Sequence, residues 1–338
     1  MRMPVSDAVE APVRTAAEAS VGDELEALRG PITGYCYRML GSAHAAEDAV
    51  QETMVRAWRG LKGLDDRSGL RPWAYRIATN VCIDALNDRR RRALPMDLAR
   101  ADDGRGDLGP PLPEATWVQP MPSRLLGVGE DPLERAVSRE TIRLAFVAAL
   151  QHLLPRQRAV LILRDVLRWR AAEVADLLGT SVDAVNSSLR RARVALARAR
   201  SDEGLSPAPG EPVDARLLEL YIDAFERFDI DRIVSLLHRD AVVSMPPFAF
   251  WLHGRDAFRV WLTSTGPACG RERHVLTEAN GCPAVAVYAP GAGGALVPSA
   301  VHVLEWRDGR IAALHAFLDP SLFAVFGLGT VGPTGEPV

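Results

Sequence analysis

The beginning of the chain carries apolar side chains at the three- and four-residue spacing of α-helices. Between Asp23 and Met39 this spacing predicts a helix that breaks near Gly30 and Pro31. A second helix is predicted over residues 45–58, after a turn in which Ser42 is a suitable N-cap. Its apolar face comprises Val50, Met54, Ala57 and Trp58, and the polar residues largely off that face are Glu47, Asp48, Gln51 and Glu52.

Aromatic and basic residues are mixed in the next stretch, residues 70–92. Trp73 and Tyr75 lie among Arg71 and Arg76, and four arginines follow at positions 89–92. Aromatic rings stack on unpaired bases and arginines neutralise phosphates, so this stretch suits nucleic acid. Two other interpretations stay open here: the tryptophans can belong to the core, and an arginine run is usually a solvated helix end.

Helical spacing resumes at Pro132 and leads to a helix-turn-helix pattern. A helix is predicted over residues 154–163, with Pro155 in its first turn, and two more over 170–179 and 182–200, joined at Gly179. We expect Ser181 to cap the last helix and its buried stripe to be Val182, Val185, Leu189 and Leu196.

The polar face of this last helix holds the candidate contacts with duplex DNA. A recognition helix places its N-terminal part over base edges in the major groove, where amides and guanidiniums read adenine and guanine. Base or near-base contacts are expected from Asn186, Ser187 and Arg190, with Ser181 beside them, and phosphate contacts from Arg170, Arg191 and Arg193. The alternative is a solvated arginine-rich helix.

The last third of the chain changes from helical spacing to alternation. Helices are expected over residues 217–225, 231–237 and 256–263, with Asp229 or Asp231 near the second cap. Strands are expected at 241–245, 273–278, 283–289, 297–306 and 310–317, with Asp308-Gly309 as the turn between the last two. This order indicates an α+β cone.

Segments rich in Pro, Gly and acidic residues separate these parts. The expected organisation is a disordered tail (1–22), a helical domain (23–94), a linker (95–131), a second helical domain (132–200), a short linker (201–212), the cone (213–327) and a tail (328–338). The fold class is thus multidomain, two all-α domains followed by an α+β domain.

Charge is distributed unevenly, although the net charge of the 338 residues is only −3. Residues 139–200 hold 12 arginines against five acidic residues, whereas residues 211–338 hold ten arginines against 15 acidic residues. One segment is therefore suited to nucleic acid and the other is not. The N-terminus has no signal peptide, no apolar run spans a bilayer, and the four cysteines lack metal-ligand spacing, so we expect a cytoplasmic protein without metal or cofactor.

The first helical domain resembles region 2 of bacterial sigma factors of the extracytoplasmic-function (ECF) group. The pattern that carries the resemblance is Asp48-x-x-Gln51-Glu52, Trp58, Trp73, Ile77-Ala78, Asn80, Asp84 and the arginines after it. The resemblance implies that Asp48, Gln51 and Glu52 dock on the β′ clamp helices of RNA polymerase. It also implies that the opened promoter strand meets Trp73, Arg76, Asn80, Arg89, Arg90, Arg91 and Arg92.

The pattern Leu154-Pro155-x-x-Arg158-x-Val160, with a helix-turn-helix after it, is similar to sigma region 4. Region 4 reads the upstream promoter element, and the β flap of the polymerase is its expected protein partner. By the same resemblance the linker threads the polymerase's active-site and RNA-exit channels. Composition alone equally favours a disordered, solvated tether.

The cone resembles the NTF2-like, SnoaL-like fold of polyketide cyclases and ketosteroid isomerases, which a subset of ECF sigma factors carries. Its ending, Phe317 to Gly327, is similar to theirs. Candidate pocket residues are Tyr221, Phe225, Met245, Trp251, His274, His302 and Trp306, with Glu305 and His315 nearby. His302 and Glu305 point in opposite directions on a strand unless a bulge intervenes, so no acid–base pair is evident and no catalytic residue is assigned. The pocket binds a small molecule or nothing.

These observations predict a promoter-specificity subunit that recruits RNA polymerase, reads two promoter elements, melts the downstream one to initiate transcription, and catalyses no covalent step alone. We expect the cone to regulate it in cis, because its acidic excess would complement the basic helix-turn-helix. Two alternatives stay open: an autonomous helix-turn-helix regulator with a ligand-sensing cone, and an isomerase- or cyclase-type enzyme fused to a DNA-binding module.

Overall fold

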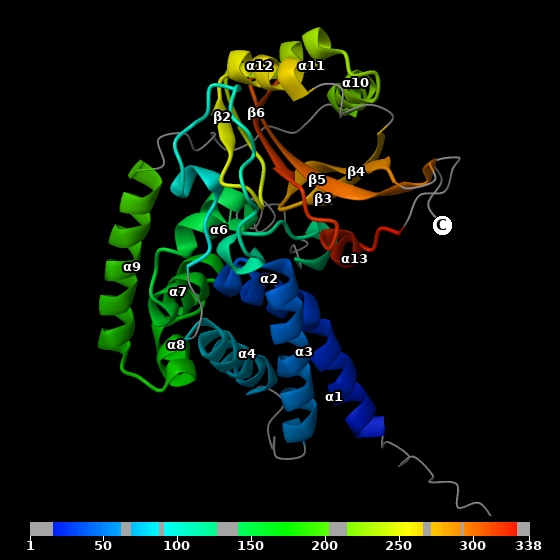
Figure 1. Ribbon diagram of the computed structural model, residues 1–338. Helices are drawn as coiled ribbons and strands as arrows, with labels where there is room; N and C mark the ends of the chain where they lie inside the picture. Colours follow the sequence, from blue (N-terminus) through cyan, green and yellow to red (C-terminus); the bar gives the residue numbers. More distant parts are fainter. Residues whose placement is uncertain are drawn as a thin grey trace, which may run out of the picture.

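The structure is a computed structural model that describes residues 16–61, 69–87, 91–126, 141–202, 215–265, 272–291 and 294–329. Its helical half lies below a sheet-containing cone (Figure 1). We call residues 16–87 the first helical unit, 91–126 the connecting segment, 141–202 the second helical unit and 215–329 the cone.

The first helical unit consists of α1 (Ala16–Ala27), α2 (Arg29–Leu40), α3 (Ala43–Gly60) and α4 (Leu70–Asn87). The break between α1 and α2 lies at Leu28, because Pro31 fits within the first turn of α2, where backbone N–H groups have no partner inside the helix. Ser42 caps α3 as predicted, its Oγ accepting from the Ala45 N–H at 3.1 Å. α4 ends at Asn87, so Arg91 and Arg92 lie outside any helix.

The connecting segment is irregular in backbone but packed. It contains short 3₁₀ turns η3 (Pro95–Asp97), η4 (Glu114–Thr116) and η5 (Ser123–Leu125), and it buries Trp117, Val118 and Met121. Its backbone donates to carbonyls of the cone from Asp102 to Trp251 and from Leu112 to Pro247, each at 2.8 Å. A solvated tether is therefore the wrong description of this part in the free chain.

The second helical unit comprises α6 (Leu144–Leu150), α7 (Pro155–Leu161), the π-turn η6 (Ile162–Val166), α8 (Ala171–Leu178) and α9 (Val182–Asp202). Gly179 ends α8 with a φ of 61°, a left-handed conformation that glycine adopts without strain. Ser181 caps α9 by accepting from the Ala184 N–H at 3.2 Å. The predicted helix-turn-helix is thus confirmed. Within the described ranges, no helix combines the length and the apolar character needed to cross a membrane.

The cone begins with α10 (Ala215–Glu226) and α11 (Ile230–Leu236), the latter capped by Asp229. A six-stranded sheet follows in the order β2-β1-β6-β5-β4-β3, in which only β1 and β6 run parallel. The remaining elements are β1 (Leu237–Ser244), β2 (Trp251–His253), α12 (Arg255–Thr265), β3 (Arg273–Ala279), β4 (Cys282–Pro290), β5 (Leu296–Arg307), β6 (Arg310–Phe317) and α13 (Leu322–Phe326). Of the described strands, sequence reasoning missed β2, whose three residues are too few to show alternation, and it did not predict the short helix α13.

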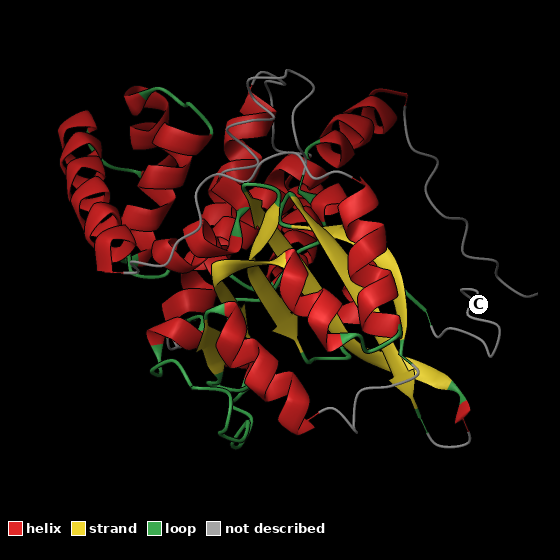
Figure 2. Ribbon diagram, turned by 90° about the horizontal axis from the view of Figure 1, so that it is seen from above, coloured by secondary structure: helices red, strands yellow, loops and turns green. Residues whose placement is uncertain are grey.

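Both faces of the sheet are covered, as Figures 1 and 2 show, by α10–α12 on one side and by the helical half on the other. On β5, Leu304 and Trp306 join the core of the cone, whereas Val301 and Val303 join one continuous core with the helical units. His302 and Glu305 accordingly lie on opposite faces, as the alternation predicts, yet both are buried. Docking of the cone on the helices is therefore largely apolar.

Candidate nucleic-acid and protein interfaces

The outward face of α3 carries the predicted protein-binding residues. Asp48, Gln51 and Glu52 are all exposed, and Glu52 forms an ion pair with Arg56 at 2.6 Å. The opposite face, with Val50, Met54 and Ala57, is buried as predicted and fixes the helix on its neighbours. The interpretation of Trp58 as a core residue is wrong, because this residue is 39% exposed. Together with Val55 it adds apolar surface beside the acidic residues of α3. Such a mixed surface suits a protein partner.

The aromatic and basic face of α4 is partly covered by the second helical unit. Trp73 is half-buried and lies against Gly60, where a Cβ would come within 2.7 Å of its ring. Arg76 donates to the Asp176 carbonyl of α8 at 2.9 Å, and Asn80 is exposed. The Arg71 guanidinium lies 5.6 Å from the ring centre of Trp169. The face predicted for the opened strand thus meets α8 in this structure.

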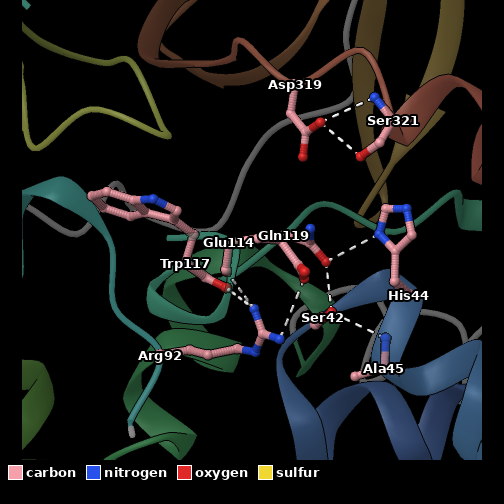
Figure 3. Close-up of polar contacts among 9 residues, drawn as sticks. All are labelled: Ser42, His44, Ala45, Arg92, Glu114, Trp117, Gln119, Asp319 and Ser321. Atoms are coloured by element: carbon pink, nitrogen blue, oxygen red, sulfur yellow. Dashed lines mark hydrogen bonds and ion pairs between the residues drawn. The ribbon is translucent and has the colours of Figure 1, made fainter. Parts of the chain in front are cut away.

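The arginine run divides into two kinds of residue. Arg89 and Arg90 lie outside the described residues, and Arg91 is exposed. Arg92 is 5% exposed and donates to the carbonyls of Glu114 and Trp117 at 2.9 and 2.7 Å (Figure 3). Assigning Arg92 to DNA is therefore wrong for this conformation, because carbonyls of the connecting segment occupy its guanidinium.

The predicted recognition helix α9 presents its candidate residues at the surface. Asn186 and Arg190 are exposed, and Arg191 donates to Ser187 at 2.8 Å. Two predicted phosphate ligands form exposed ion pairs, Arg193 with Asp165 at 2.7 Å and Arg170 with Glu173 at 2.8 Å. Exposed pairs contribute little to stability, so phosphate can displace these carboxylates. Val182, predicted as buried, is 41% exposed.

One buried asparagine joins three parts of the chain. Asn280, between β3 and β4, is fully buried and exchanges two hydrogen bonds with Met121 of the connecting segment, both at 2.9 Å. Its Nδ2 also donates to Tyr37 Oη of α2 at 2.6 Å and to the Ile142 carbonyl. Sequence reasoning missed this residue, although the dipeptide Asn280-Gly281 between two predicted strands was a hairpin signal.

A second contact between the cone and the helices is an ion pair. The Glu305 carboxylate lies 3.3 Å from Arg143, and both side chains are largely buried. Burial raises the pKa of Glu305, and the guanidinium of Arg143 acts in the opposite direction. Removing either partner would leave the other charge buried and unbalanced, which is costly.

The interior of the cone gathers part of the predicted pocket. Tyr221 Oη and His302 Nδ1 are 2.8 Å apart, Phe225 packs against both, and the His274 ring centre lies 6.4 Å from that of His302. Among described residues, neither ring nitrogen of His274 has a hydrogen-bond partner, although Nε2 lies 3.8 Å from Glu272 Oε2. Met245 and Trp306 join this core, but Trp251 does not: its Nε1 donates to the Ala99 carbonyl of the connecting segment, so its assignment to the pocket is wrong.

Burial holds three histidines of the cone neutral. The pKa of His302 falls to about 3, and those of His274 and His315 fall to about 4, in each case chiefly through desolvation. No three metal-ligating side chains come together in the part of the chain that the structure describes.

We expect the cone to lose stability as the pH falls. Because these pKa values lie below the ordinary histidine value of 6.5, the unfolded state binds protons first, and stability is lost progressively below pH 6.5. Between pH 7 and pH 5 each such histidine should cost about 2 kcal/mol. Urea unfolding of His302→Gln should show a smaller loss than wild type, while exposed His253→Gln should match wild type; equal losses in all three would contradict this.

Comparison with known families identifies three segments. Residues 25–92 match the model of Sigma-70 region 2, residues 143–196 match Sigma-70 region 4, and residues 218–314 match the SnoaL-like domain. These segments overlap, respectively, the first helical unit, the second helical unit with its helix-turn-helix, and the cone. The predicted resemblances are thereby confirmed.

Relatives with the same order of segments cover most of the chain. An ECF RNA polymerase sigma factor of Mycobacterium tuberculosis, SigG, is 47% identical over 310 residues, which is 90% of this chain and 82% of SigG. A second one from that organism, SigJ, is 27% identical over 89% of this chain and 92% of its own. The crystal structure of SigJ superposes with a TM-score of 0.58, at 25% identity, over 90% of this chain and 98% of the other.

Proposed function

The chain belongs to the ECF RNA polymerase sigma factors, and from this premise we propose how its surfaces divide the work of starting transcription. Sigma factors direct core RNA polymerase to promoters. In this chain, α3 binds the β′ clamp helices, α4 holds the opened downstream element, and α9 reads the upstream element while its unit meets the β flap. The observation that carries the proposal is the exposed face of Asp48, Gln51 and Glu52 on a helix whose other face is fully packed.

Run-off transcription with core polymerase tests this proposal against its two alternatives. A sigma factor initiates only with polymerase and depends on Asp48. An autonomous regulator would bind duplex DNA tightly by itself and would tolerate Asp48→Ala. A fused enzyme would turn over a small hydrophobic substrate, and changes at Asp48 would leave that turnover intact.

Arg190 should matter for promoter sequence and not only for affinity. It is exposed on α9, where a guanidinium can bind a guanine edge in the major groove. We expect Arg190→Ala to weaken holoenzyme binding to the cognate promoter by about tenfold to a hundredfold and to relax discrimination at one base pair. Gel-shift competition between promoter variants measures both effects. The control is Arg198→Ala, which changes an exposed arginine two turns later on α9. Equal losses of promoter binding in the two variants would show that Arg190 does not recognise a base.

We infer that the cone regulates the sigma factor in cis by holding its two helical units together. Asn280 bonds to α2, to the connecting segment and to the start of the second unit, and Glu305 pairs with Arg143 of that unit. Meanwhile α4 and α8 cover each other. The region predicted for opened DNA is therefore exposed fully only after the units part. The contacts are mostly apolar, so the acidic excess of the cone is not what supports this inference.

We further infer that the chain performs no covalent chemistry of its own and that its cone can take a small hydrogen-bonding ligand. Sigma-factor membership favours the first point, although SnoaL-like relatives include enzymes. His274 supports the second, because Nδ1 of this buried ring has no hydrogen-bond partner among the described residues. Loss of a ligand-induced rise in Tm in His274→Phe would support such binding, and an unchanged rise would refute it.

A further inference from the structure

A basic cavity lies where the two helical units meet. It has a volume of about 220 Å³ and is bounded by the ends of α2 and α4, the start of the connecting segment and the loop that enters α7. None of its lining residues is acidic. They are Leu40, Leu86, Arg91, Arg92, Gln151, His152, Leu153, Leu154, Pro155 and Arg158.

Arg158, at the inner wall of the cavity, is a buried cation with only neutral acceptors. It is 3% exposed and donates to the side-chain oxygen of Gln151 at 2.7 Å, to the carbonyls of Gln151 and Leu153 at 3.1 Å, and to the Met39 carbonyl. Its Nε has no hydrogen-bond partner among the described residues. Desolvation lowers the pKa of Arg158 to about 10, opposed by Cys82 and reinforced by the charge of Arg91.

Arg91, a second arginine at this cavity, adds to its unbalanced positive charge. Arg91 is exposed at the rim, and its charge repels that of Arg158. Arg92 differs, because the carboxylate of Glu114 lies 3.5 Å from its guanidinium. A buried charge without a counter-ion is costly, and the attraction of an anion between Arg91 and Arg158 would offset both their repulsion and the cost of burying Arg158.

We propose that this cavity binds a small phosphate-bearing anion between Arg91 and Arg158. Guanidinium groups form strong, often paired hydrogen bonds with phosphate oxygens. The cavity is several times larger than the ~30 Å³ that one water occupies in the liquid, so a phosphate or diphosphate group has room.

An anion bound in this cavity would stabilise the conformation in which the two helical units are docked on each other. Leu40 and Leu86 come from the first helical unit and Arg158 from the second, so the cavity exists only while the units are docked. A ligand that binds one conformation shifts the equilibrium toward it. The anion and core polymerase should therefore compete for the free chain.

The test uses the full chain with inorganic pyrophosphate at constant ionic strength, read by calorimetry and by the rise in Tm. Arg91→Gln removes a rim charge without touching the packed interior, and Arg156→Gln removes an exposed arginine of the same helix as Arg158 but outside the lining. We expect Arg91→Gln to weaken binding by about tenfold or more, and Arg156→Gln to bind as wild type does.

Parallel titrations with orthophosphate, ATP and a single-stranded oligonucleotide identify the source of the phosphate. Tighter binding of ATP than of pyrophosphate, lost in Arg91→Gln, would assign the site to a nucleotide; the reverse order would assign it to an inorganic anion. The proposal is wrong if wild type does not bind pyrophosphate, if the two variants lose it equally, or if Arg91→Gln reduces only oligonucleotide binding.

Discussion

Asp48→Arg should reduce run-off transcription by roughly a hundredfold at limiting sigma factor, without loss of folding. Reversing a charge at the centre of a protein interface typically costs about 2–5 kcal/mol, and 1.4 kcal/mol is a factor of ten. Asp48 is exposed on α3 beside Gln51 and Glu52, so its replacement removes no packing within the chain. The stability of the free protein should change by no more than about 0.5 kcal/mol.

The transcription assay needs matched variants to locate this effect on α3. Asp23→Arg makes the same charge change at an exposed residue of α1 and should leave transcription near wild type. Asp48→Asn should give an intermediate loss, since it removes attraction without adding repulsion. If Asp48→Arg and Asp23→Arg were equally active and bound core polymerase equally well, α3 would not be the polymerase-binding surface.

Asn280→Gly should loosen the docking of the cone and raise basal transcription. Asn280 has a φ of 55°, so glycine keeps the backbone conformation while the side-chain hydrogen bonds disappear. Losing these bonds and leaving the Met121 N–H buried without an acceptor should cost about 3 kcal/mol, or roughly a hundredfold in the ratio of docked to undocked chains. We expect several times more transcript at limiting protein and faster hydrogen exchange along β3 and β4.

Two variants make the Asn280 result specific. Tyr37→Phe removes the hydroxyl that accepts from Asn280 and should act in the same direction. Glu278→Ala, an exposed change two residues away on β3, should behave as wild type. Undocking by hydrogen exchange without any rise in transcript would show that the cone stabilises the chain and does not restrain it. These single changes are preferable to removing residues 205–338, which would expose the apolar core shared with the helices.

Local patterns were sufficient to predict the helices and most strands, because helical spacing, caps and turns are encoded by near neighbours. Ser42, Gly179 and Asp229 each stand where the structure needs a cap or a left-handed residue. The predictions that failed concern which side chains of a helix face are covered by the rest of the protein. Trp58 and Val182 lie at the edges of apolar stripes, and they remain 39% and 41% exposed.

The residues that join the parts could not be assigned from spacing. Arg92 was predicted to bind DNA and Trp251 to line a pocket. Instead, both side chains donate hydrogen bonds to carbonyls of the connecting segment. A stronger signal was present in β4, whose run Ala284-Val285-Ala286-Val287 is apolar without alternation. Such a run is typical of a strand covered on both faces, so it indicated that the cone is packed on both sides.

The continuous core between the cone and the helical units has a consequence for dosage in the cell. A restraint carried on the same chain acts at a fixed effective concentration, commonly millimolar for a short connection, however few copies are made. Dilution or overproduction cannot change the proportion of restrained molecules, as it would with a separate inhibitor. If the proposed restraint holds, a signal would release this sigma factor by shifting the equilibrium within the chain, and not by changing the amount of a separate inhibitor.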